Sequence, residues 1–297
     1  MKKFFSILLC TLFIYSAFSP TLGFSADEQP NRCINHLTDS MELLYKKNPY
    51  ATRIMTYNVL SDGLGFDGMS VETRDDDLLR LIKTISPDVL SLQEVNVNWY
   101  KSLLNKAFLY KFICPLNYAL SFSMTTILYN TETTELIDWG SEAYTCSNDS
   151  RLRSYTWGVF LQKNTGFKFI VINTHLSMFE KNADLPINQA SELTDFCNTI
   201  KNLYSYPIYV TGDFNTKVRT EDSENSAVYE YLNLFFNNAL DISSNVSWGT
   251  STDVNTCPND YIFTTDDTNI INYVLLSQPY LNVISDHFPV FIDILET

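Results

Sequence analysis

Basic residues are scarce in this sequence. Lysine and arginine together number 20 against 34 aspartates and glutamates in 297 residues, which gives a net charge of −14. Removal of residues 1–25, whose only charged side chains are Lys2 and Lys3, would leave 18 basic against 34 acidic residues and a net charge of −16. This balance argues against a broad basic face that binds long nucleic acid. It is compatible with a site where a bound divalent cation supplies the local positive charge.

Cysteine pairs with metal-binding spacing are also missing. Five cysteines follow residue 25 and none belongs to a C-x-x-C pair: Cys33, Cys114, Cys146, Cys197 and Cys257. A structural zinc site is therefore not expected. If the protein is exported, one or two disulfides are expected, with at least one thiol left over. The spacing leaves their pairing open.

The apolar run near the N-terminus is short for a membrane span. It extends from Phe4 to Phe18, whereas a transmembrane helix needs about 20 apolar residues. Two lysines precede the run, and small residues follow it before Ala26, a pattern typical of a signal peptide over residues 1–25. We expect an exported, soluble, monomeric protein, with a single membrane anchor as the alternative.

The remaining sequence has no internal break. Residues 50–297 contain no repeat, low-complexity tract or Pro/Gly-rich linker, so we expect one domain there, preceded by a lead-in over residues 26–49 with a short helix around residues 41–46. Apolar periodicity predicts strands at 53–57, 88–92, 125–129, 156–161, 167–173, 207–210, 261–264, 272–276 and 289–295, and helices at 72–85, 99–108, 188–204 and 227–237. Strands interleaved in this way with helices are typical of an α/β protein with mixed sheets.

Polar side chains stand at the ends of these predicted strands. Asn58, Glu94, His175 and Asp213 follow carboxyl ends, while Asp260, Asp286 and His287 precede amino ends. If the second group of strands runs antiparallel to the first, all seven side chains reach one edge of the sheets. Each residue alone is typical of a turn or a helix cap. Together they indicate a site carried by loops on a rigid frame.

The side chains at this edge suit the hydrolysis of phosphate esters. Glu94 and Asp286 offer hard oxygen donors, which favours Mg²⁺ or Mn²⁺ over zinc. Such a metal neutralises charge on the attacked phosphate. Asn58, Asn215 and a protonated His175 can donate hydrogen bonds to phosphate oxygens and so stabilise the transition state.

A water nucleophile also needs a base. His287 is the candidate because the unperturbed pKa of histidine lies in the useful range, and a carboxylate on its other ring nitrogen would orient the imidazole. Asp260 is the candidate for that carboxylate. The sequence therefore predicts a His–Asp pair beside the metal-binding carboxylates.

Six short motifs carry a resemblance to a known family. They occur in family order and span residues 53–290: Y-N-V (57–59), L-Q-E-V (92–95), N-T-H-L (173–176), G-D-F-N (212–215), N-D-Y-I-F (259–263) and S-D-H-F-P-V (285–290). The sequence resembles the endonuclease/exonuclease/phosphatase superfamily, the group of the pancreatic-type DNases and apurinic-site endonucleases. The resemblance implies a four-layer α/β sandwich, with two mixed sheets face to face and helices outside. It also implies a divalent-metal-dependent phosphoester hydrolase.

The resemblance implies a role for each matched residue. The set comprises the principal metal ligand Glu94 with Asn58 and Asp286 near the metal, the dyad His287–Asp260, the phosphate-side His175, the water-aligning Asp213, the phosphate-binding Asn215 and the substrate-side Arg153. Whether Asp213 or His287 is the base stays open. A solvated surface arginine is an equally good interpretation of Arg153.

Departures from the family pattern limit the substrate. Residues 123–125 read S-M-T where many members carry a Glu or Gly-Asn, so no catalytic carboxylate is expected there. Thr216 and C-P-N-D-Y-I (257–262) argue against the inositol 5-phosphatases.

The first hypothesis for the function is an exported phosphodiesterase acting on DNA or RNA. The second keeps the mechanism but takes a phospholipid head group or a small phosphate ester. The third is a non-catalytic binding protein on the same fold.

Overall fold

The computed structural model describes most of the chain after residue 44. The described ranges are 45–62, 70–114, 125–146, 152–178, 184–216, 223–248, 259–266, 268–277 and 279–296. The expected signal peptide over residues 1–25 lies outside these ranges, as does most of the expected helix around residues 41–46. Among the described helices, none is long and apolar enough to cross a membrane.

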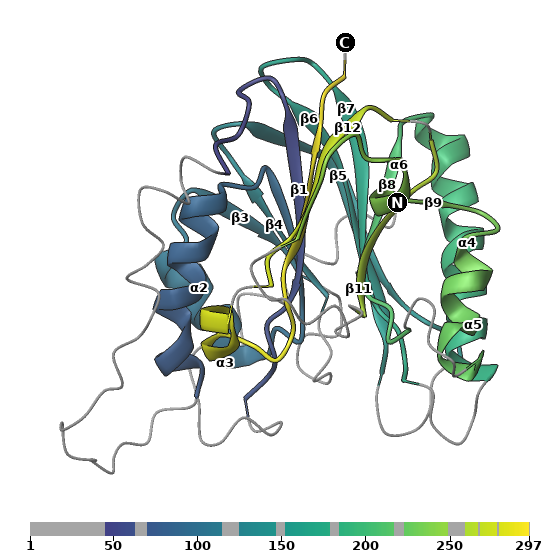
Figure 1. Cartoon of the computed structure of the whole chain (residues 1–297), viewed down its shortest axis with the longest axis horizontal. Helices are drawn as coiled ribbons and strands as arrows, with labels where there is room; N and C mark the ends of the chain where they lie inside the picture. Colours follow the sequence, from purple (N-terminus) through teal and green to yellow (C-terminus); the bar gives the residue numbers. More distant parts are fainter. Residues whose placement is uncertain are drawn as a thin grey trace, which may run out of the picture. The chain divides into compact units, whose positions relative to one another are not determined.

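Two mixed sheets form the centre of the fold (Figure 1). In order across the first sheet, the strands are β10 (Val246–Trp248), β12 (Ile270–Leu275), β13 (Val290–Ile294), β1 (Thr52–Asn58), β2 (Val89–Gln93), β4 (Thr126–Asn130) and β3 (Tyr110–Ile113). In the second sheet the order is β5 (Thr134–Ala143), β6 (Ser154–Gln162), β7 (Lys168–His175), β8 (Ile208–Asp213), β11 (Asp260–Thr264) and β9 (Asn237–Asn238). The described strands confirm the mixed-sheet prediction.

Helices cover the outer faces of both sheets (Figure 1). They are α2 (Val71–Ile85), α3 (Val97–Lys106), α4 (Asp184–Tyr204), α5 (Ser223–Leu232) and the 3-10 helix η2 (Pro279–Val283), whereas the short α6 (Ala239–Ile242) packs against the core between the sheets. Apolar residues of α2 and α3 form one core with the first sheet, and those of α4 and α5 form another with the second. A third core, which includes Phe160, Phe169 and Ile292, lies between the sheets. These three cores define the expected four-layer sandwich.

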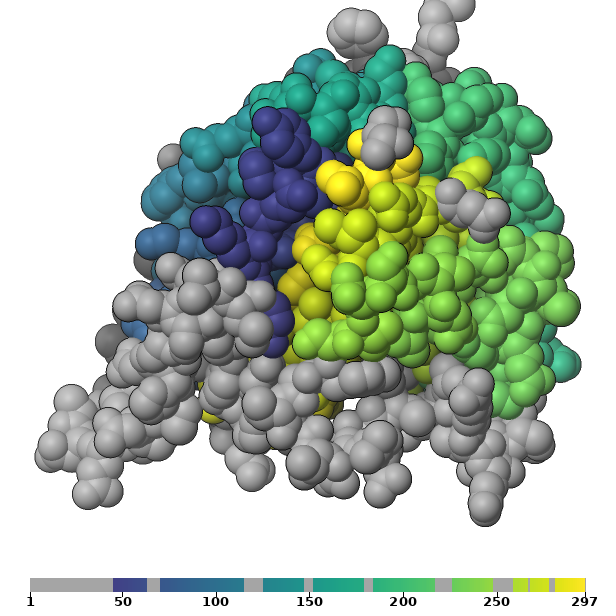
Figure 2. Space-filling model, turned by 45° about the horizontal axis from the view of Figure 1, so that its top comes forward, coloured from purple at the N-terminus to yellow at the C-terminus, as the bar shows by residue number. Residues whose placement is uncertain are grey.

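The apolar content of a strand explains whether it lies at the centre or at the edge of its sheet. Every residue of β1 is buried, as expected for a strand covered on both faces, whereas β5 at the sheet edge alternates between buried and exposed residues. Burial of each large apolar side chain contributes about 1.5–3 kcal/mol. Figure 2 shows the purple segment that contains β1 against the yellow C-terminal segment, which agrees with the antiparallel pairing of β1 and β13.

Three helix predictions were wrong at their ends. Helix α3 lies at Val97–Lys106, not at 99–108, and α5 begins at Ser223, not at residue 227. Helix α4 begins at Asp184, not at residue 188, because Pro186 lies in the first turn, where its missing N–H costs no helical hydrogen bond. Helix α5 ends at Leu232, not at residue 237, because the chain turns and then adds β9 to the sheet. Strands β3, β5, β9 and β10 were not predicted.

Strand direction brings the predicted polar residues to one edge. Strand β1 is parallel to β2, and β7 is parallel to β8, so their carboxyl ends coincide in pairs. Strand β13 is antiparallel to β1, and β11 is antiparallel to β8, so their amino ends reach the same edge. The predicted antiparallel arrangement is confirmed, and it places the loops that carry the candidate site together.

Candidate active site

Three side chains of the candidate site approach the carboxylate of Asp213. Asp213 ends β8, where it lies opposite His175 of β7 and opposite Asp260 of β11 in the strand register. Its Oδ2 accepts a hydrogen bond from Asn58 Nδ2 at 3.0 Å and lies 3.3 Å from His175 Nε2. The Nε2 atom of His287 is 3.8 Å from the same oxygen. One buried oxygen thus joins groups from both sheets.

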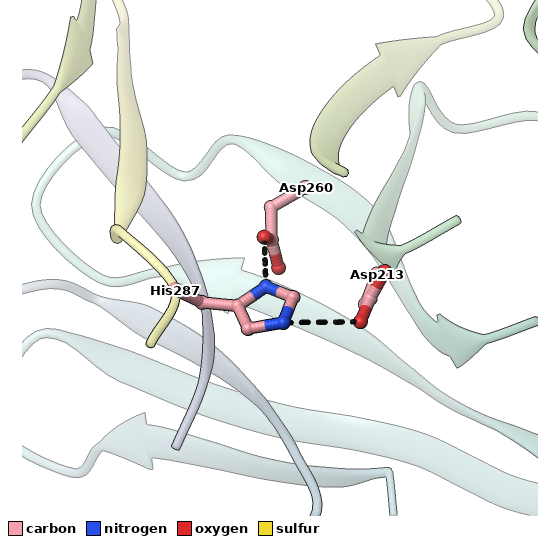
Figure 3. A group of neighbouring side chains, drawn as sticks. All are labelled: Asp213, Asp260 and His287. Atoms are coloured by element: carbon pink, nitrogen blue, oxygen red, sulfur yellow. Dashed lines mark hydrogen bonds and ion pairs between the residues drawn. The ribbon is translucent and has the colours of Figure 1, made fainter. Parts of the chain in front are cut away.

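His287 lies between two carboxylates, as Figure 3 shows. Its Nδ1 is 2.6 Å from Asp260 Oδ2, which is the predicted His–Asp pair. Burial lowers the pKa of His287, but the negative charges of Asp260 and Asp213 outweigh burial and raise that pKa to about 10. In the metal-free protein His287 is therefore an imidazolium at neutral pH, with Nδ1–H donated to Asp260 and Nε2 at 3.8 Å from Asp213, beyond hydrogen-bond distance.

The carboxyl group of Asp213 has a raised pKa. Burial raises its pKa, the nearby charge of His287 lowers it and the charge of Asp260 raises it, and the result is a pKa of about 6. An oxygen with this pKa can accept a proton near neutral pH. Its Oδ1 is held by the backbone N–H of Asn215 at 2.9 Å.

Glu94 is held in place just beyond the end of β2. Its backbone is in the left-handed region, with φ of 62°, a conformation that non-glycine residues rarely adopt. One carboxylate oxygen accepts from Asn58 Nδ2 at 3.2 Å and the other from the Ser61 N–H at 3.0 Å. Asn58 therefore bridges the carboxylates of Glu94 and Asp213.

Three other predicted residues have distinct positions. Asn215 donates from Nδ2 to the Leu176 carbonyl at 2.8 Å, which leaves its second amide hydrogen for a phosphate oxygen. Asp286 is exposed beside the dyad, and its Oδ1 lies 3.3 Å from Ser285 Oγ. Arg153 is only 2 % exposed, so its interpretation as a solvated surface arginine is wrong. Its role in substrate binding stays a prediction.

Sequence reasoning missed the residues that support the site. Ser61 holds Glu94 through its N–H and also donates from Oγ to the Glu94 carbonyl at 2.7 Å. Ser285 Oγ donates to the Asn58 carbonyl at 2.7 Å and accepts from the His287 N–H at 3.2 Å. Both serines lie next to the quoted motifs, but only the folded chain shows that they join two loops.

The donor set fits a divalent metal. Within the described residues, no lysine or arginine forms an ion pair with any of four carboxylates at this edge: Glu94, Asp213, Asp260 and Asp286. Ligand atoms of Asp213, Asp260 and His287 lie within 4.8 Å of one another and form one possible metal group. However, the 2.6 Å hydrogen bond already engages Asp260 with His287. Glu94 offers oxygens bonded only to neutral amides, so it is the better ligand for a hard cation.

Comparison with known families identifies the class of the protein. The sequence profile of the Endonuclease/Exonuclease/phosphatase family matches residues 55–287. The chain therefore belongs to this family, and the protein is a metal-dependent hydrolase of phosphoesters. No curated protein matches the sequence significantly.

Solved structures share the fold across most of the chain. An endonuclease/exonuclease/phosphatase from Bacteroides vulgatus has 23% identity and a TM-score of 0.69, with 83% of this chain and 99% of that chain covered. A mannosyl-6-phosphatase from Bacteroides thetaiotaomicron has 18% identity and a TM-score of 0.69, with 82% and 100% covered. The human nocturnin catalytic domain, solved with a bound sulfate anion, has 20% identity and a TM-score of 0.59, with 84% and 95% covered.

Proposed function

We propose that the protein is an exported, divalent-metal-dependent phosphodiesterase, with nucleic acid as the first substrate to test. The observation that carries this proposal is the convergence of Asn58, His175 and His287 on the Oδ2 atom of Asp213. As a result, Asp213, a proton acceptor, is surrounded by side chains that can donate hydrogen bonds. In-line attack of water on a phosphate needs both kinds of group, an acceptor for the proton of water and donors for the phosphate oxygens.

In the proposed mechanism Asp213 orients the attacking water and accepts its proton. The pKa of about 6 suits this role, whereas His287 already carries a proton when Asp260 and Asp213 are ionised. His287 then serves as a donor to the phosphate and not as the base. We therefore choose Asp213 over His287 as the base. A bound Mg²⁺ or Mn²⁺, held by Glu94 with Asn58 and Asp286, would neutralise charge on the phosphate.

The remaining polar groups bind the phosphate. His175 Nε2 faces Asp213 at 3.3 Å, so its ring lies next to the oxygen that orients the water. Asn215 is fixed by its contacts with Asp213 and Leu176, and its free amide hydrogen can donate to an equatorial oxygen. Side chains held in this way need little rearrangement during the reaction.

A small phosphate ester is the second candidate substrate. The net charge of −14 disfavours a long polyanion, and a mannosyl-6-phosphatase shares the fold. A small ester needs contacts with only one phosphate, so the acidic surface opposes its binding less.

A substrate panel tests these proposals. Plasmid DNA, RNA, sphingomyelin, bis-p-nitrophenyl phosphate and sugar phosphates should be incubated with the parent protein in Mg²⁺, Mn²⁺ or EDTA. We expect cleavage of a diester with metal and none with EDTA. Turnover of sugar phosphates alone would favour the second candidate. A His287→Ala variant as active as the parent on every substrate would contradict the enzymatic mechanism.

Export has its own test. Expression in a bacterial host should give protein outside the cytoplasm whose N-terminal sequence begins at Ala26. Soluble cytosolic protein that retains residues 1–25 would contradict the proposal.

A further inference from the structure

Arg74 is a buried arginine whose hydrogen bonds go to loops and not to a carboxylate. Its side chain in α2 is inaccessible to solvent. Nη1 donates to the carbonyls of Val59 at 2.9 Å and Ile284 at 2.7 Å, and Nη2 donates to the carbonyl of Leu60 at 2.9 Å. The nearest ion-pair contact is with Asp62, at 3.8 Å.

The three carbonyls belong to two segments that leave the sheet. Val59 and Leu60 follow the end of β1, and Ile284 precedes β13. Outside the strands these carbonyls have no partner in the sheet ladder. The carbonyl of Leu60, whose backbone is left-handed with φ of 56°, also accepts from Trp99 Nε1 at 2.9 Å. Buried carbonyls need a hydrogen-bond donor, and a guanidinium can serve several of them because it has five N–H groups in a fixed plane.

The same two segments carry both halves of the candidate site. The first contains Asn58 and Ser61, which hold the carboxylate of Glu94. The second contains Ser285, whose Oγ accepts from the His287 N–H. Arg74 is therefore linked to Glu94, the proposed metal ligand, through the loop that contains Ser61. It is linked to His287 of the His–Asp pair through the loop that contains Ser285.

We propose that Arg74 is a positioning residue that sets the separation between Glu94 and His287 by binding the two loops that carry them. The proposal rests on the proposed function because it assigns Glu94 to the metal. Lysine cannot replace Arg74 in this role, since its single ammonium group cannot reach three carbonyls in one plane. The Trp99 ring, 5.0 Å from the guanidinium carbon, further limits the orientation of the group.

The protein contains a matched control for Arg74. Arg53 of β1 is also buried, donates to the carbonyls of Tyr45 and Ile85, and lies over an aromatic ring, that of Phe291. It differs in having a bidentate carboxylate partner, Asp293, at 2.7 and 2.8 Å. Arg53 lies near the start of β1, whereas Asn58 of the site ends that strand. Its loss should lower stability without moving the site.

The test measures metal binding without substrate. Mn²⁺ affinity is determined by calorimetry for the parent, Arg74→Lys and Arg53→Lys, and thermal unfolding is followed for all three. Residues that orient metal ligands typically change metal affinity by 10- to 100-fold when replaced, so Arg74→Lys is expected to weaken Mn²⁺ binding by about that factor. Arg53→Lys should lower the unfolding temperature but keep the Mn²⁺ affinity of the parent.

Three outcomes would contradict the proposal. Arg74→Lys could bind Mn²⁺ as the parent does, Arg53→Lys could weaken binding equally, or hydrogen exchange of residues 59–62 and 284–287 could be unchanged in Arg74→Lys. If Arg74→Lys fails to fold, Arg74→Gln decides the question because its neutral amide can donate to only part of the set of carbonyls. Weaker Mn²⁺ binding by this variant supports the proposal, and unchanged binding contradicts it.

The readout separates this inference from the proposed function. A parent protein that binds Mn²⁺ but cleaves nothing in the substrate panel would refute the proposed function. The effect of Arg74→Lys on Mn²⁺ affinity would still decide the role of Arg74.

Discussion

The two ends of the central strands balance their charges in opposite ways. At the start of β1, the Arg53 guanidinium pairs with Asp293, and Lys47 pairs with the buried Asp88. At the other end, four carboxylates share an edge where no described lysine or arginine forms an ion pair with them. Lysine and arginine neutralise the carboxylates at the first end, whereas at the second end the imidazolium of His287 lies beside Asp260 and Asp213, and Glu94 has no ion pair with a described residue.

Left-handed backbone, in contrast, occurs near both ends. Leu60, Glu94 and Asn215 adopt it at the site edge, and Ser86 and Ser205 adopt it shortly before β2 and β8 at the opposite end. Such conformations each cost about 1–3 kcal/mol and persist only where the surrounding structure enforces them. The two ends therefore differ in how their charges are paired and not in backbone strain. The contrast predicts different consequences for matched substitutions at the two ends.

The largest expected effect comes from Asp213→Asn. Loss of the proposed base should reduce kcat by about 10²- to 10⁴-fold. Asp76→Asn, at a carboxylate that is 65% exposed, should leave kcat near that of the parent. Equal activity of Asp213→Asn and the parent would remove Asp213 from the mechanism.

The same substitution should stabilise the metal-free fold. The pKa of Asp213 is about 6 in the folded protein, above the value of about 3.9 for an unfolded aspartate. Between these values the folded state binds more protons than the unfolded state, so stability falls as pH rises through this window. In EDTA above pH 6, Asp213→Asn should melt at a higher temperature than the parent. The difference should shrink as the pH falls toward 4.

At the paired end, Asp293→Asn should change stability and not catalysis. It leaves the buried Arg53 without its bidentate carboxylate, and breaking a buried ion pair in this way costs about 3–5 kcal/mol. Denaturant unfolding measures the loss. The control is Asp266→Asn, whose pair with Lys201 is about one-third exposed and should contribute less than about 1 kcal/mol. A change in kcat per folded molecule would show that the two ends are coupled.

A smaller effect is expected from Gly212→Ala. A Cβ atom at Gly212, where φ is 149°, would lie 2.0 Å from the Thr174 carbonyl oxygen, so β7 and β8 would have to separate beside Asp213. Gly166 also has a positive φ, of 76°, but a Cβ atom there meets no atom within 4 Å. Overpacking costs about 1–3 kcal/mol, and Gly212→Ala should be less stable than Gly166→Ala by about that amount. Equal unfolding free energies would show that the strands adapt without strain.

Much of this architecture could be predicted from the sequence. Strands such as β1 and β13 are short apolar runs, and α2 has helical apolar spacing, so local patterns were sufficient to locate them. The edge strand β5 was missed because it is half polar and bordered by no strong turn signal. Helix ends were also uncertain, because the tertiary fold decides whether a proline such as Pro186 begins a helix or precedes it.

The residues of the site could be selected from the sequence, but their contacts could not. Local motifs located Glu94, Asp213 and His287 because each is a polar group at the end of an apolar strand. That Asn58 bridges Glu94 and Asp213, and that Arg74 binds the carbonyl of Ile284, 210 residues away in the chain, depends on strand order and direction. A sequence records which groups are available, since their chemistry is local. Which of them meet is decided by the tertiary structure, because pairing and packing join residues without regard to their separation along the chain.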